Sequence, residues 1–195
     1  MGLKANADGS GAIQVGGSDA ITITSGLVVS MNGGPNYPLI RGTAVASTSG
    51  TSIDFTGIPS WVDRITVMFS GVSTSGSSNY LIQIGSGSIS NTGYDSAASS
   101  FNATNVGSTI GYILAASIVA TSVVSGSVVI TLTNPSTNLW VSAGTMVNTT
   151  NPASNGAGHV SGGNKTLSGA LDRIRITTVN GTDTFDAGSI NILYE

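Results

Sequence analysis

The sequence has 195 residues, of which six are Lys or Arg and nine are Asp or Glu, giving a formal net charge of -3. So few basic residues form no basic stripe for a phosphate backbone, and we expect no nucleic-acid partner. Because the chain has no cysteine, it can form neither a disulfide framework nor a thiolate metal site.

Residues 1–40 contain three short apolar segments, GAIQVGG, AITITSG and LVVSMNGG, which are separated by glycine-containing turns. Strands of about four residues cannot close a core alone. Because Ile21 and Ile23 alternate with threonines, the segment needs a partner surface, and we expect that surface to be the same segment in neighbouring copies. We therefore predict a trimerising stalk or attachment segment over residues 1–40, followed by a linker or bend in NGGPNYP.

Longer apolar segments begin at about residue 41, at the spacing of a sandwich or barrel. Charged residues make up only 8% of the sequence, and β-branched residues recur between clusters of Gly, Ser and Asn, which favours an all-β fold. We predict a jelly-roll-like antiparallel β-sandwich over residues 41–195. Its expected strands are SIDF, RITVMFSGV, YLIQIGS, GYILAAS, GSVVITLT, LWVSAGTMV, RIRITTV and SINILYE.

The most apolar run, from Ile110 to Ala120, is too short to span a membrane and is interrupted by Gly111 and Ser117. We interpret it as a buried strand and expect no membrane insertion. The start, MGLKANADGS, has no apolar core of signal-peptide length, so we expect no classical secretion.

The chain ends in SINILYE, where Ile190, Ile192 and Tyr194 alternate with other residues up to the last position. Domain ends usually fray unless they are tied into a sheet. We therefore predict that the last residues form a strand inside the fold, and that a chain ending at Gly188 does not fold.

Several stretches resemble the domain found at the C-terminal ends of tail fibre and related virion proteins of tailed bacteriophages. They are GTSIDFTGIPSWVDRITVMFSGVSTSGSSNYLIQIG, TGY, NPSTNLWVSAGT and TLSGALDRIRITTVNGTDTFDAGSINILYE, and together they span about residues 42–195. The preceding LKANADGSGAIQVGGSDAITIT is similar to the repetitive stalk segments of such fibres. The stalk is shorter here than in most members of the family.

The resemblance implies a virion structural protein that is made in the host cytoplasm. It would be a homotrimer that displays its sandwich outward on a tail fibre or the capsid surface. Residues 1–40 would attach it to other virion proteins, and the sandwich would bind a host cell-surface glycan as an adhesin. A capsid decoration or head-fibre protein is one alternative. A polysaccharide depolymerase is the other, although we expect no enzyme activity, cofactor or catalytic residue.

His159 is the single histidine and lies in the glycine-rich NGAGHVSGG, where we expect a surface loop. Neither a cysteine nor a Gly-x-Ser-x-Gly elbow is present to act with it as a nucleophile. No two carboxylates have a spacing that singles them out for glycoside hydrolysis, and Asp183 with Asp186 offers too few oxygens for calcium. We expect no metal site. The other carboxylates considered are Asp54, Asp63, Asp95 and Asp172.

Aromatic faces stack on the C–H surfaces of sugars, which makes three residues candidates for glycan binding. Trp140 alternates with Leu139 and Val141, so it is placed on the face opposite these apolar residues. Trp61 precedes a predicted strand, and Tyr94 lies in a segment predicted to be a polar loop. The alternative is that each ring packs in the core or at its rim, as most tryptophans do.

Overall fold

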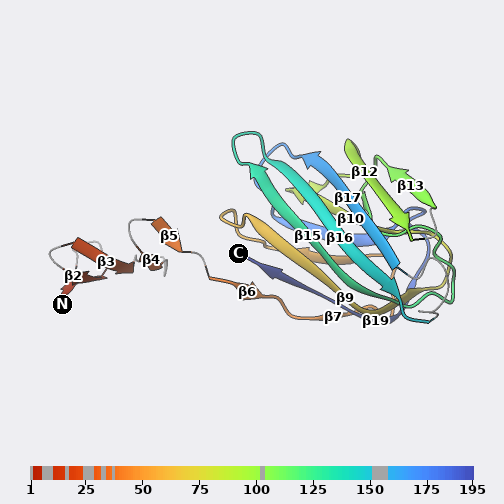
Figure 1. The fold of residues 1–195 in the computed structure, drawn as a ribbon, viewed down its shortest axis with the longest axis horizontal. Coiled ribbons are helices and arrows are strands. Elements are labelled where there is room, and N and C mark those ends of the chain that lie inside the picture. The colour runs from red at the N-terminus through yellow and green to blue at the C-terminus, as the bar shows by residue number, and fades with distance from the viewer. Residues whose placement is uncertain are drawn as a thin grey trace. The chain divides into compact units, whose positions relative to one another are not determined.

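The computed structural model describes residues 2–5, 11–15, 18–23, 29–31, 34–36, 38–101, 104–150 and 158–195. The chain divides into two compact units, Met1–Leu39 and Ile40–Glu195, one residue away from the predicted boundary. Every regular element of the described residues is a β-strand, and every strand pairing is antiparallel (Figure 1). The predicted all-β fold is thus confirmed.

The N-terminal unit is a five-stranded sheet in which each strand pairs with the next along the chain. The three apolar segments supply its second, third and fourth strands. Part of the predicted linker forms the fifth strand, whereas Asn32, Gly33 and Tyr37 of that linker lie outside the described residues. Pairing between copies belongs to an assembly and stays a prediction. The strands are β1 (Gly2–Ala5), β2 (Gly11–Val15), β3 (Ser18–Ile23), β4 (Val29–Met31) and β5 (Gly34–Asn36).

The larger sheet of the C-terminal unit follows the order β13-β12-β17-β16-β15-β9-β19-β6, with β7 also paired to β19. Its strands are β6 (Ile40–Arg41), β7 (Val45–Ala46), β9 (Arg64–Thr74), β12 (Tyr94–Ser100), β13 (Asn105–Ser108), β15 (Val124–Asn134), β16 (Leu139–Asn148), β17 (Gly158–Thr166) and β19 (Phe185–Tyr194).

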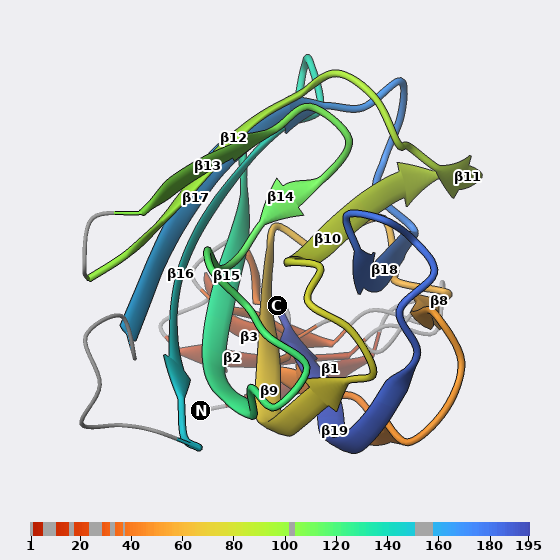
Figure 2. The same ribbon diagram turned by 90° about the vertical axis from the view of Figure 1, so that its right-hand side faces the viewer.

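The smaller sheet follows the order β11-β10-β18-β8, with β14 also paired to β10. It faces the larger sheet, as Figure 2 shows, so the two sheets form the predicted β-sandwich. The chain crosses repeatedly between them, for instance from β8 to β9 to β10. The strands are β8 (Ile53–Thr56), β10 (Tyr80–Ser86), β11 (Ser88–Ile89), β14 (Tyr112–Ile113) and β18 (Arg173–Thr178).

The C-terminal strand lies within the larger sheet, as the alternation in SINILYE predicts. β19 pairs with β9 on one side and with β6 and β7 on the other. Ile190 and Ile192 are buried in the core, and Tyr194 packs against it. The amide of Glu195 still donates to the carbonyl of Arg64 at 3.0 Å, so the hydrogen-bonded ladder continues to the last residue.

A large apolar core lies between the two sheets. A second, smaller cluster contains Leu81, Ala98 and Ile113. The large core draws alternate residues from the strands of both sheets, such as Ile65 and Val67 of β9 and Ile174 and Ile176 of β18. Each large apolar side chain contributes roughly 1.5–3 kcal/mol when it leaves water, before the cost in conformational entropy.

The apolar run from Ile110 to Ala120 is buried over much of its length, but it is not the predicted strand. Only Tyr112 and Ile113 pair as β14, and the residues that follow form bends and a turn. Ser117 has a φ of 60°, a left-handed conformation that a strand does not accommodate. Periodicity alone cannot separate a buried strand from an irregular buried segment.

Candidate functional site

A polar cleft is lined by two segments that are far apart in the sequence, residues 86–91 and residues 165–168. We call it the hairpin cleft, because the first segment contains the turn between β10 and β11 and the strand β11 itself. Its volume is about 430 Å³. Six of its nine lining residues carry a neutral hydroxyl or amide group. The lining residues are Ser86, Ser88, Ile89, Ser90, Asn91, Lys165, Thr166, Leu167 and Ser168.

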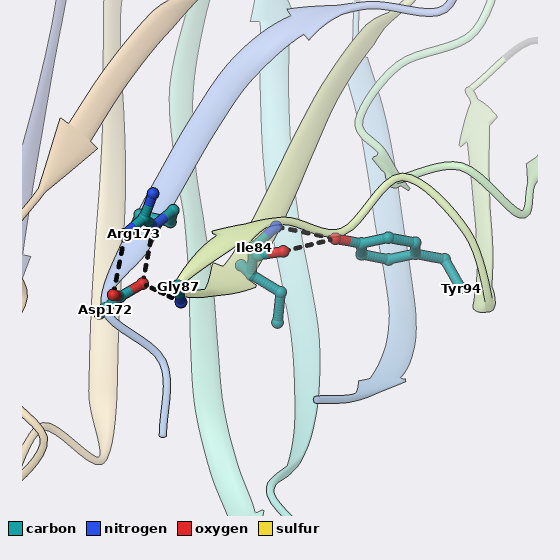
Figure 3. Close-up of polar contacts among 5 residues, drawn as sticks. All are labelled: Ile84, Gly87, Tyr94, Asp172 and Arg173. Carbon is teal, nitrogen blue, oxygen red and sulfur yellow. Dashed lines mark hydrogen bonds and ion pairs between the residues drawn. The ribbon is translucent and has the colours of Figure 1, made fainter. Parts of the chain in front are cut away.

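The tip of the hairpin is held by the connection that leads into β18 (Figure 3). The amide of Gly87 donates to Oδ1 of Asp172 at 3.1 Å. Arg173 donates to both oxygens of the same carboxylate, from Nε at 2.8 Å and from Nη2 at 3.0 Å. The hydrogen bonds from Arg173 are the main reason that the pKa of Asp172 lies below its usual range. The carboxylate therefore stays charged at neutral pH and fixes the turn.

The base of the hairpin is held by the hydroxyl of Tyr94 (Figure 3). This hydroxyl accepts a hydrogen bond from the amide of Ile84 at 2.8 Å. Its proton faces two carbonyl oxygens, that of Ser90 at 2.9 Å and that of Ile84 at 3.2 Å. Burial raises the pKa of Tyr94, so the phenol remains protonated and keeps its role as a donor. Tyr94 thus ties both ends of the 84–90 segment together.

Two of the three aromatic residues predicted to bind a glycan are instead part of the core. Trp140 is 1% exposed and Tyr94 is 3% exposed, so neither offers a ring face to a ligand. The alternation of Trp140 with Leu139 and Val141 is real, but Trp140 points inward and these neighbours are only partly buried. Sequence alternation separates the two faces of a strand without saying which one is inside.

Trp61 is half-buried and packs against the core, with its ring centroid 6.0 Å from that of Tyr194. It does not line the hairpin cleft. Contact between Trp61 and a glycan stays a prediction.

Lys165 is the cleft residue with a charged side chain, and sequence reasoning did not select it. It lies on β17 and is 9% exposed. Its Nζ donates to the carbonyl of Thr92 at 2.8 Å and lies 5.3 Å from the centroid of the Tyr94 ring. The rarity of basic residues was a signal in the sequence that could have drawn attention to Lys165. The chain has only two lysines and six basic residues altogether.

Two smaller hollows adjoin the hairpin cleft on the side of the smaller sheet. One, of about 260 Å³, shares Ser88 and Ile89 with the cleft. The other, of about 280 Å³, shares Asn91. Arg175 lines both hollows, but it is bound by two hydrogen bonds of 2.7 Å to the carboxylate of Asp54. These neighbouring surfaces are therefore polar, with much of their charge already paired.

His159 is not in a surface loop. It lies on β17, is 2% exposed, and accepts a hydrogen bond on Nδ1 from the amide of Ala116 at 3.4 Å. The glycines and serine around His159 predict a loop, but in the structure those from Gly158 onward belong to β17, which pairs with β12 and β16. Residues 155–157 of the predicted loop lie outside the described residues.

Several of the candidate carboxylates have an ion-pair or hydrogen-bond partner in the structure. Asp54 and Asp172 form ion pairs with arginines. Asp183 accepts hydrogen bonds from the amide of Ser78 at 2.9 Å and from Nδ2 of Asn180 at 2.6 Å, and Asp186 accepts one from the Ser73 hydroxyl. Within the described ranges, no group of three or more His, Cys, Asp or Glu residues could hold a metal ion.

Comparison of the chain with protein-family models, with curated proteins and with solved structures found no match. In the part of the chain that the structure describes, no helix is long and apolar enough to cross a membrane. The evidence for a function therefore comes from the residues and geometry of the chain itself.

Proposed function

We propose that this chain is a non-enzymatic virion structural protein, a trimeric fibre or adhesin that binds a host surface glycan in the hairpin cleft. Residues 1–40 form the attachment segment in this proposal, and the sandwich of residues 41–195 is the displayed domain. The resemblance of residues 42–195 to the C-terminal domains of phage tail fibres supports the virion role. The composition of the hairpin cleft supports the binding of a glycan.

The observation that carries the binding proposal is the composition of the hairpin cleft. Serine and threonine hydroxyls and the amide of Asn91 can each both donate and accept, which matches the hydroxyl groups of a sugar. Ile89 and Leu167 add apolar surface for the C–H face of a sugar ring. The cleft is built by the ends of β10, β11 and β17 and by the connecting residues that follow β11 and β17. Connections held by a scaffold of strands are where binding residues are commonly placed.

The partners of the carboxylates support a non-enzymatic role. Glycoside hydrolysis needs two free carboxyl groups that flank one bond, one of them acting as an acid or base. The hairpin cleft has no carboxylate among its lining residues, and the nearest ones in sequence, Asp172 and Asp95, do not line it. A cleft of this composition can hold a saccharide through hydrogen bonds without cleaving it.

Binding is tested with the purified protein on a panel of bacterial surface saccharides, followed by titration calorimetry on any saccharide that is retained. Ser168→Tyr fills the cleft from an exposed position and should abolish binding. Thr145→Ala, on the exposed face of β16, is the control and should bind as the unchanged protein does. Equal binding by both variants would remove the cleft from the proposal, and steady release of reducing ends would contradict the non-enzymatic role.

The virion role is tested by imaging intact particles that carry a labelled copy of the chain. The proposal expects label at the tail. Label confined to the head would replace the tail-fibre assignment with a capsid decoration or head-fibre protein, and particles without any label would contradict the virion role altogether.

A further inference from the structure

Lys165 enters the hairpin cleft from inside the sandwich. On β17 it lies directly between Tyr94 of β12 and Trp140 of β16, both of which are buried. Side chains at directly opposed positions of neighbouring strands share a face of the sheet. The stem of Lys165 therefore belongs to the inner face. Its Nζ lies 2.8 Å from the carbonyl of Thr92, the residue that follows Asn91 of the cleft.

In the part of the chain that the structure describes, the ammonium group of Lys165 has no carboxylate partner. Among the described residues, no carboxylate oxygen lies within 4.0 Å of its Nζ, and the carbonyl of Thr92 is its hydrogen-bond acceptor there. A lysine ammonium carries three N–H donors. The ring of Tyr94 offers only a weak attraction compared with a counter-ion.

A buried cation without a counter-ion is costly to the folded protein. Burial accordingly lowers the pKa of Lys165 from its usual value. The two nearby arginines do not share this property, because Arg173 and Arg175 are each paired with an aspartate through two hydrogen bonds. Lys165 is thus the one cation at these hollows that still lacks an anion within the described residues.

We propose that the hairpin cleft selects an anionic saccharide, with the acidic group of one sugar unit on the ammonium of Lys165. The serine hydroxyls and Asn91 then hold neighbouring sugar hydroxyls. The acidic group is a carboxylate, a sulfate or a phosphate, since each supplies the missing negative charge. This inference rests on the proposed glycan binding and specifies its chemical class.

The test uses the full chain and a panel that contains uronic-acid, sulfated, phosphorylated and neutral oligosaccharides. For each retained uronic-acid saccharide, its carboxyl-reduced counterpart is measured by titration calorimetry. We expect retained saccharides to be anionic, and removal of the acidic group to weaken binding about tenfold or more, as loss of a charge-assisted hydrogen bond does. Comparing the uronic-acid, sulfated and phosphorylated saccharides of the panel shows which of the three acidic groups the cleft prefers.

Two variants assign the effect to Lys165. Lys165→Met keeps the apolar stem and removes the charge, so it should bind the acidic saccharide as weakly as the unchanged protein binds the neutral counterpart. Arg41→Met removes one positive charge from an exposed position on β6 and should leave binding unchanged. The comparison of the two saccharides needs only the unchanged protein, so it decides the matter even if Lys165→Met does not fold.

The outcomes separate this inference from the proposed function. Retention of neutral saccharides only, or equal affinity for the acidic and reduced forms, would overturn the anionic class and leave glycan binding intact. No retention of any saccharide would overturn the proposed function itself. A tenfold loss that is the same in Arg41→Met and Lys165→Met would assign the effect to net charge and contradict the role of Lys165.

Discussion

The imidazole of His159 lies where a positive charge would be costly. It is buried, and burial lowers its pKa below the ordinary value of 6.5. Its Nδ1 accepts the amide proton of Ala116, so protonation of that nitrogen would replace an acceptor with a second donor. The folded protein therefore holds this histidine neutral under conditions in which the unfolded chain protonates it.

This difference makes stability depend on pH. Between the lowered folded pKa and 6.5, the unfolded state binds more protons, so stability falls as the pH falls through that window. We expect a loss of about 1.4 kcal/mol for each unit by which burial lowers the pKa. Thermal unfolding between pH 7.5 and 5 should show a falling Tm for the unchanged protein and a nearly constant one for His159→Gln. Parallel curves for the two proteins would contradict the assignment.

The candidate site was only partly predictable from its residues. The prediction that loops of the sandwich carry the binding groups stays a prediction, and the hairpin cleft is lined both by strand ends and by the residues that follow them. The aromatic residues Trp140 and Trp61 do not line it. In a chain so rich in serine, the serines of the cleft have no distinguishing sequence signal. Tyr94 lies beneath the cleft and organises it through its hydroxyl, a role that becomes visible only when Ile84 and Ser90 are placed beside it.

At the scale of elements, the strands that the sequence predicts are those with apolar residues on alternate positions. β10 begins and ends where YLIQIGS predicts, and β9, β15, β16 and β18 agree within a few residues. β12 and β17 were missed, because their inward positions carry small or polar residues such as Ser96 and His159. These inward groups are hydrogen-bonded, for example from the amide of Ile113 to the Ser96 hydroxyl at 2.9 Å.

The pairing of β9 with β19 contains register shifts on both sides of Ala187, next to Gly188. Gly188 has a φ of 89°, and a Cβ atom there would overlap the carbonyl of Gly71. Gly57 has a similar φ of 75° but nothing within 4 Å of such an atom. The two glycines share a backbone conformation and differ in the space around it.

Alanine at these positions separates conformational strain from overlap. Gly57→Ala should cost about 1–2 kcal/mol, the price of a left-handed residue with a side chain. Gly188→Ala should cost about 2–5 kcal/mol, because the overlap adds to that strain. Urea unfolding of both variants measures the difference. Equal costs would show that the β9–β19 pairing tolerates a side chain at residue 188 and that the close approach to Gly71 is unimportant.

At the scale of the molecule, the sandwich is held by its apolar core, with little contribution from charges. The described residues form three ion pairs, and each has both side chains at least partly exposed. Exposed pairs of this kind contribute about 0–1 kcal/mol each and are screened by salt. We therefore expect the Tm to change by only a few degrees between low and high salt, and a large fall at high salt would contradict this account.

The proposed assembly is a property of the N-terminal unit. The described strands of the N-terminal unit have six residues or fewer, and strands this short cannot close a core alone. We therefore expect the full chain to be a homotrimer. A fragment of residues 41–195 should keep the circular dichroism of the sandwich and assemble less tightly. Light scattering of both samples measures their masses, and a monodisperse monomer of the full chain would refute the trimer.

The central claim is that the hairpin cleft holds a glycan, and mapping of a bound saccharide by NMR tests it most directly. Titration of a retained oligosaccharide into the isotope-labelled protein should shift the amide signals of residues 86–91 and 165–168, with those of the exposed face of β16 unchanged. Shifts that cluster on β16, or on any surface that leaves both cleft segments unchanged, would contradict the claim.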